Sequence, residues 1–214
     1  MSDTEGVSVS ITKLEAARRQ LDTAIDLYFD NADSLSIHTL AFASLKVLFD
    51  IYPHHKDDGF TDQMNAILKA EGWRLISSVA NFLKHADRDP YAVLASHSLD
   101  QTMSIIGFAT LLYRRLSGDY SLKMKAFDHW WEELAYEKIG IEEIDKRKER
   151  VATFDKIRND LREMSHDQRM VLAKQIYQHF LEHFERLQKV VDEAKAAGME
   201  VTELLDREIP KSAS

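Results

Sequence analysis

The stretch TKLEAARRQLDTAIDLYFD (residues 12–30) decides the fold class of this chain. Its apolar side chains recur every three or four residues and therefore share one face of a helix; they are Leu14, Ala17, Leu21, Ile25 and Tyr28. Thr12 and Glu15 stand at the spacing of a capping box, in which each residue satisfies a free backbone N–H of the other. The segment predicts an amphipathic α-helix with one buried stripe.

The same spacing recurs through the following hundred or so residues. It predicts four more helices, at about residues 34–52, 61–85, 90–118 and 121–139. Pro53 is expected to end the first of these, because proline disfavours helical backbone at the residue before it. The second is open to a break near Gly72. Asp89 and Pro90 have the residue types of an N-cap and a first helical position, which predicts that the next helix starts there. Gly118 is expected to end that helix.

The C-terminal part predicts two different kinds of helix. Residues 141–170 carry eight basic and eight acidic side chains, a mixture typical of an exposed helix with ion pairs between successive turns. Ser165 and Gln168 have the spacing of a second capping box, and Gly198 suits a helix C-terminus. A final long helix to Ala197 is therefore predicted, with the apolar stripe Leu172, Ile176, Phe180, Phe184, Leu187, Val191 and Ala194.

Composition agrees with this all-α prediction. The 214 residues include only 7 Gly and 3 Pro, too few for the many turns of a β-sandwich or barrel. Without cysteine the chain has neither disulfides nor thiolate metal sites. We expect an all-α helical bundle core at residues 12–118, long C-terminal helices at residues 119–208 that pack on the core or on a partner, and flexible tails at 1–11 and 209–214.

Charge and hydropathy restrict location and partners. The net charge of −8 disfavours binding of nucleic acid by the whole surface. Residues 1–10 lack the basic and apolar regions of a signal peptide. The apolar stretch Met103 to Leu116 is too short to span a bilayer. The expectation is a cytoplasmic protein with no membrane partner.

The segment NFLKHADRDP (residues 81–90) concentrates polar side chains between two predicted helices. In one interpretation they only cap the helix ends, since a cation such as Lys84 stabilises a helix C-terminus and a carboxylate such as Asp89 an N-terminus. In the other they line a pocket that binds an anion or transfers protons. The candidate pocket residues are His38, Lys84, His85, Asp87 and Arg88, because antiparallel packing would bring the start of the second helix to the end of the third.

The same segment, with residues 19–25 and 36–41, resembles a family of uncharacterised bacterial helical proteins. More distantly, Asn81 to His85 resembles the motif of the HEPN superfamily. That resemblance implies a four-helix core, frequent dimers, and ribonuclease activity in toxin and defence systems, with Asn81 and His85 as catalytic candidates at motif positions. Lys84 is a third candidate, as a substitute source of the cation that the motif's Arg supplies. Ala80 stands where the motif has Arg, which puts the ribonuclease reaction in doubt because it needs a cation to stabilise the phosphate transition state.

Three further histidines carry alternatives. His38 lies among apolar residues and is either a satisfied core histidine or the partner of His85 in a metal site or proton relay. His179 and His183 are one turn apart, a spacing that metal sites use, but no glutamate completes the known zinc motif. They remain weak metal candidates, and no cofactor is expected.

Three functions remain open. The first is a non-catalytic homodimer that binds a partner or regulates one, favoured because the chain lacks the phosphate loop, dinucleotide fingerprint and nucleophile elbow of common enzymes. The apolar stripe of the last helix is long enough to need a second chain. The second is a HEPN-like RNA-binding protein or degenerate ribonuclease, and the third is a bundle that binds a small ligand or a metal ion.

Overall fold

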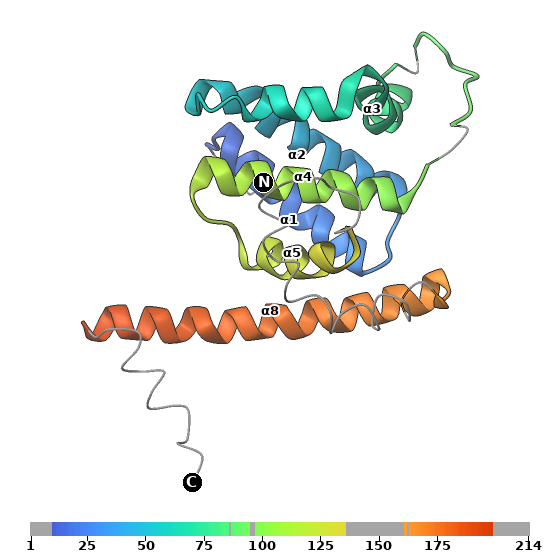
Figure 1. Cartoon of the computed structure of the whole chain (residues 1–214). Helices are drawn as coiled ribbons and strands as arrows, with labels where there is room; N and C mark the ends of the chain where they lie inside the picture. Colours follow the sequence, from blue (N-terminus) through green and yellow to red (C-terminus); the bar gives the residue numbers. More distant parts are fainter. Residues whose placement is uncertain (1–9, 86, 95–96, 136–160, 162, 199–214) are drawn as a thin grey trace, which may run out of the picture. The chain divides into compact units, whose positions relative to one another are not determined.

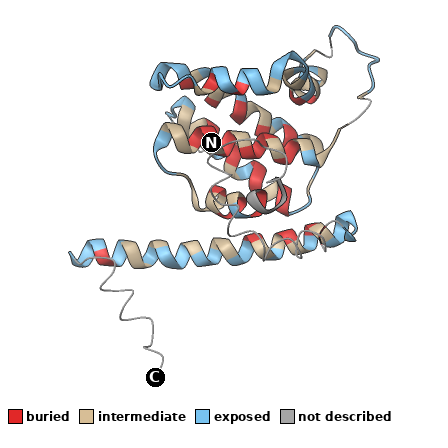
Figure 2. Ribbon diagram, viewed as in Figure 1, coloured by how far each residue is buried: buried red, intermediate tan, exposed pale blue. Residues whose placement is uncertain are grey.

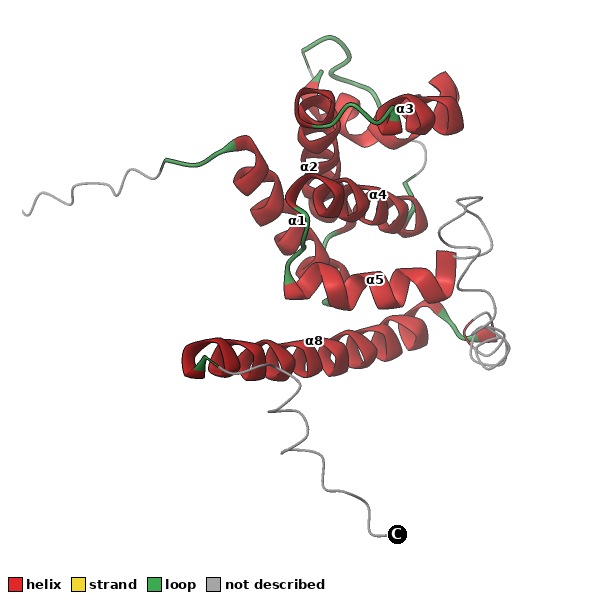
Figure 3. Ribbon diagram, turned by 60° about the vertical axis from the view of Figure 1, so that its left-hand side comes forward, coloured by secondary structure: helices red, strands yellow, loops and turns green. Residues whose placement is uncertain are grey.

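The computed structural model describes residues 10–85, 87–94, 97–135, 161 and 163–198. These residues form six helices and no strand (Figures 1 and 3), so the prediction of an all-α helical bundle is confirmed. The chain divides into two compact units, Met1–Met124 and Lys125–Ser214. The division falls six residues after the boundary predicted at residue 118, because the first turn of the next helix belongs with the N-terminal unit.

Three helices form the core of the N-terminal unit: α1 (Lys13–Phe29), α2 (Ser34–His55) and α4 (Leu99–Ser117). α2 packs against both of the others, and the buried residues concentrate where these helices meet (Figure 2). Thr12 caps α1 as predicted, since its hydroxyl accepts the N–H of Glu15. The carboxylate of Glu15 instead binds Arg18 and Arg19, so the reciprocal half of that capping box is not formed.

Pro53 does not end α2, which continues through two further residues to His55. The N–H of Lys56 donates to the carbonyl of Tyr52 and closes the last turn. Tyr52 is buried, and its hydroxyl donates to Asp58 in the loop that follows. These bonds hold the last turn in helical form after the proline, which corrects the prediction of a stop at residue 52.

The helix α3 (Phe60–Lys84) is kinked at Lys69 and not at Gly72. Lys69 has φ 52° and ψ −176°, a left-handed region that residues with a Cβ rarely occupy. The kink separates a short N-terminal half from a longer C-terminal half. Although α3 has 25 residues, only Thr61, Met64, Ile76 and Val79 are buried.

Asp89 and Pro90 form a turn, and α4 begins nine residues later than predicted. The N–H of Ala92 donates to the carbonyl of Asp89 across this turn. The actual N-cap is Ser98, whose hydroxyl accepts the N–H of Asp100. Val93, in the segment predicted to be helical, lies outside the helix and is 84% exposed. Gly118 ends α4 in the left-handed conformation, as expected.

The remaining described helices are α5 (Leu122–Ala135) and α8 (His166–Ala197). The predicted capping box of Ser165 and Gln168 is present in both directions, and Gly198 is the C-cap of α8. The predicted exposed helix at residues 141–170 and the predicted end of the preceding helix at residue 139 lie largely outside the described residues.

Among the described helices, α2 is the one with the length and composition that could cross a membrane. By this measure α2, and not the apolar stretch at residues 103–116, is the candidate for a membrane-spanning helix. The central helix of a folded bundle passes the same test, because its side chains are covered by neighbouring helices.

Candidate functional site

The predicted polar segment forms an exposed corner at the end of α3. Lys84 is the last residue of the helix and His85 is its C-cap. The backbone N–H of Arg88 donates to the carbonyl of His85 and turns the chain away from the helix. Lys84, Asp87 and Arg88 are exposed, His85 is half-buried, and no hydrogen bond or ion pair joins these four side chains within the part of the chain that the structure describes.

Asn81, the other catalytic candidate, lies one turn before His85 on α3. Its side chain is exposed, and its amide Nδ2 donates to the hydroxyl of Ser77 at 3.2 Å. Asn81 and His85 are therefore within one helical turn, as the motif requires, but the residue in the place of its arginine is Ala80. This corner has the geometry of a capped helix end.

His38 is fully buried between α2, α3 and α4, with 0% of its surface exposed. Its Nε2 lies 3.0 Å from the carbonyl oxygen of Ile76 on α3. Its Nδ1 lies 3.1 Å from the hydroxyl oxygen of Thr102 on α4. Both ring nitrogens are thus occupied by protein groups, as in a core histidine that is fully hydrogen-bonded.

His38 consequently does not line an open pocket with Lys84, His85, Asp87 and Arg88, and this part of the prediction is corrected. His38 contacts α3 at Ile76, nine residues before His85. At about 1.5 Å of rise per residue, that separates the two levels of the helix by roughly 13 Å. α3 packs on α2, as the prediction of antiparallel neighbours requires. The prediction placed the end of α3 beside His38, whereas the turn that contains Ile76 lies there.

The histidine that does lie beside His38 is His97, in the segment before α4. The two ring centroids are 5.2 Å apart and the rings are nearly perpendicular, at 75°. Both ring nitrogens of His97 are buried and have no hydrogen-bond partner among the described residues. We call His38, Ile76, His97 and Thr102 the His38 cluster.

Sequence analysis missed His97 because it assigned residues 90–118 to one helix. A detectable signal was present: Ser98 and Gln101 have the same spacing as the capping box of Ser165 and Gln168. That pattern indicates a helix start at Ser98 and would have placed His97 directly before it. Its closeness to His38 still depends on how α2 and α4 pack.

Burial governs the electrostatics of the cluster. Loss of solvent lowers the pKa of His38 below its ordinary value, and the nearby His97 lowers it further, while the hydrogen bond to the carbonyl of Ile76 acts in the opposite direction. At the start of α2, hydrogen bonds from Ser36 lower the pKa of Asp33, and the positive charge that His97 can carry adds to this effect.

A second polar cluster joins α2, α3 and α4 at Tyr52, Asp58, Phe60 and Arg115. The guanidinium of Arg115 donates to the Tyr52 hydroxyl at 2.9 Å and to the Asp58 carboxylate at 3.1 Å, and it lies 4.2 Å from the centroid of the Phe60 ring. The hydrogen bond from Tyr52 is the main cause that lowers the pKa of Asp58. Because every group has a partner within the protein, we interpret this cluster as a structural contact that holds α2, α3 and α4 together.

In the C-terminal unit, His179 and His183 are exposed on α8 and lie beside a stack of aromatic rings. The ring of His129 lies 4.6 Å from Phe180 and 5.5 Å from Phe184, nearly parallel to both. No group of three or more side chains that could hold a metal ion occurs within the described residues. His179 and His183 thus have no third ligand there.

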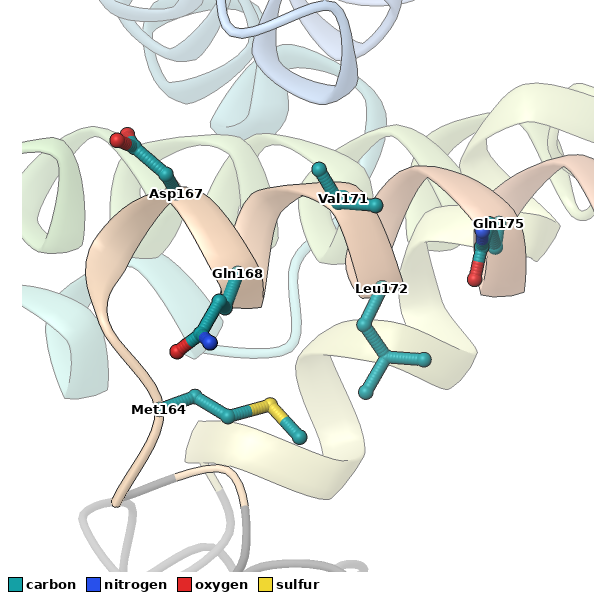
Figure 4. A pocket seen from close by; sticks show the side chains of 6 residues that line it. All are labelled: Met164, Asp167, Gln168, Val171, Leu172 and Gln175. Carbon is teal, nitrogen blue, oxygen red and sulfur yellow. The ribbon is translucent and has the colours of Figure 1, made fainter.

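A shallow groove of about 420 Å³ lies at the N-terminal end of α8 (Figure 4). Its lining consists of Met164, Asp167, Gln168, Val171, Leu172 and Gln175, and although three of these six residues are polar, apolar surface makes up most of it. Gln168 is already engaged in the capping box with Ser165. The groove therefore offers an apolar contact surface without a charged pair or a nucleophile–base pair inside it.

Comparison of the chain with protein-family models, with curated proteins and with solved structures finds no match.

Proposed function

We propose that this chain is a non-catalytic helical protein that acts by binding, with a second copy of itself as the first partner. The observation that carries the proposal is the distribution of exposed apolar side chains. The described residues contain eight large exposed hydrophobic side chains, and five of them lie on α3 or in the segment directly after it: Ile67, Leu75, Leu83, Tyr91 and Val93.

Single exposed apolar residues are normal on any protein surface, but their concentration in one region is typical of a contact surface. Tyr91 is 95% exposed and Val93 is 84% exposed. Tyrosine is also among the residues enriched at protein interfaces. Along the chain, the exposed residues Lys84, Asp87 and Arg88 lie between Leu83 and Tyr91 and add charged side chains to this segment.

Chemistry supports binding over catalysis. Within the described residues, the buried His38 is fully hydrogen-bonded, and the side chains of the candidates Asn81, Lys84 and His85 form no hydrogen bond with one another. A catalytic site needs such convergent groups in a concave pocket. The HEPN-like alternative would place an RNA-binding or ribonuclease site at this corner.

Light scattering on the full chain tests the proposal. The monomer mass is 24.7 kDa, and we expect a particle of about twice that mass at micromolar concentration. Leu75→Ser and Val93→Ser should shift the equilibrium toward monomer by about tenfold or more each, on the scale of an interface residue worth 1.4 kcal/mol. Ile11→Ser, an exposed aliphatic residue before α1, is the matched control and should leave the dimer intact.

A 24.7 kDa particle across the micromolar range would contradict the dimer. A dimer that tolerates Leu75→Ser and Val93→Ser as well as Ile11→Ser would move the interface away from α3, with the apolar stripe of α8 as the next candidate. Metal-independent RNA cleavage that is lost in His85→Ala would replace the proposal with the ribonuclease hypothesis.

A further inference from the structure

The His38 cluster places a titratable ring at the contact between α3 and the rest of the N-terminal unit. Ile76, whose carbonyl faces His38, is one of only four buried residues of α3. Close to it, the ring of Trp73 on α3 contacts Phe49 on α2, with centroids 4.8 Å apart. The N-terminal end of α3 is held at Phe60 by the second polar cluster. After the kink at Lys69, the attachment of α3 to α2 includes a small apolar contact and one hydrogen bond from a buried histidine.

The hydrogen bonds define the tautomer of the neutral His38 ring. A carbonyl oxygen only accepts, so Nε2 must carry a proton and donate it to Ile76. In the neutral ring, Nδ1 is then an acceptor, and the hydroxyl of Thr102 donates to it. The same hydroxyl has a second acceptor, the carbonyl of Ser98 at 3.3 Å.

Protonation of Nδ1 would reverse this bond. Nδ1 would donate to the Thr102 oxygen, and the hydroxyl would turn to Ser98. The hydrogen bonds can therefore be satisfied in both states, and the cost of protonation is the burial of a positive charge without a carboxylate partner.

The charges around the cluster make that cost larger. Of the described residues, His97 is the titratable group whose charge acts on His38, and it is repulsive when both rings are protonated. α3 contributes a carbonyl to the cluster and α4 contributes a hydroxyl, so neither offers a compensating negative charge. Asp33, the N-cap of α2, interacts electrostatically with His97.

We propose that His38 is a pH-sensitive latch, which in its neutral state holds the part of α3 after Lys69 on α2 and α4 and which releases that part when the ring is protonated. Water can reach the charged ring only if an element moves, and α3 has fewer buried residues than α1, α2 or α4. The inference does not depend on the proposed dimer, because both states belong to a single chain.

The direction with pH follows from the lowered pKa of His38. The released form binds a proton at the ordinary histidine pKa of about 6.5, while the latched form resists it. The latch is therefore at full strength above about pH 6.5 and weakens as the pH falls below that value. The equilibrium between the two forms changes by at most about tenfold per pH unit for one proton.

NMR of the full chain between about pH 8 and pH 5 tests the latch, with the imidazole signals of His38 and the indole N–H of Trp73 as reporters. We expect His38 to titrate below about 6.5 and Trp73 to lose its native signal with the same midpoint. His38→Gln keeps a donor and an acceptor but does not titrate, and it should abolish the change at Trp73. His179→Gln, at an exposed histidine of α8, is the control and should behave as the wild type.

A His38 that titrates at or above 6.5 would overturn the inference, as would a Trp73 signal that stays native throughout the range. A Trp73 change that persists in His38→Gln would assign the pH response to another group and would also overturn it. If His38→Gln fails to fold, the two midpoints in the wild-type chain decide: coincidence supports the latch and separation contradicts it.

Discussion

α2 and α3 are similar in length, with 22 and 25 residues, and both belong to the N-terminal unit. α2 buries seven side chains, including Ile37, Leu45 and Leu48, and packs against three other helices. α3 buries four and has a left-handed residue in its middle. Apolar residues number 12 of the 22 in α2 and 13 of the 25 in α3, so apolar content does not separate the two helices. Helical spacing is enough to make a helix, and the packing of neighbouring helices against it decides whether it becomes part of the core.

The largest expected effect is on the free energy of unfolding when one leucine of each helix is shortened to alanine. Leu45→Ala in α2 removes a fully buried side chain and should lower the free energy of unfolding by about 2–5 kcal/mol. Leu75→Ala in α3, at a side chain that is 49% exposed, should cost about 0.5 kcal/mol or less. Urea denaturation of both variants measures the difference, and equal losses would show that α3 belongs to the core.

A smaller change in the free energy of unfolding tests the kink in α3. The sign of that change distinguishes a kinked helix from a continuous one. At the backbone angles of Lys69 only glycine is free of steric strain, so Lys69→Gly should stabilise the protein by about 1 kcal/mol. In a continuous helix the same change would cost about 1 kcal/mol. Ala70→Gly, one position later in regular helix, is the control and should be destabilising.

Much of the fold could be predicted because its signals are local. Thr12, Ser165 and Gly198 mark helix ends through bonds to residues within four positions, and they lie where the spacing predicted. The failures have physical causes that are not local. Tyr52 holds the turn after Pro53 through Asp58 and Arg115, and Arg115 is 57 residues beyond Asp58.

The candidate site was less predictable than the fold. His38 was foreseen as either a core histidine or a ligand, and only the packing of three helices shows that its two nitrogens are filled by Ile76 and Thr102. The segment at residues 81–90 attracted attention by its composition, yet its side chains are mostly exposed. Composition identifies polar residues, whereas their convergence depends on the register between helices that are distant in sequence.

Native-state hydrogen exchange of the full chain, followed residue by residue near pH 7, tests most directly whether α3 is a weakly held helix on a firm core. The amides of α3 at residues 70–84 should open with a lower free energy than those of α2 at residues 37–52, because they depend on far less buried surface. A separation of about 2 kcal/mol or more between the two sets is the predicted result. Equal protection in α2 and α3 would contradict the account, because it would mean that the two helices unfold together as one core.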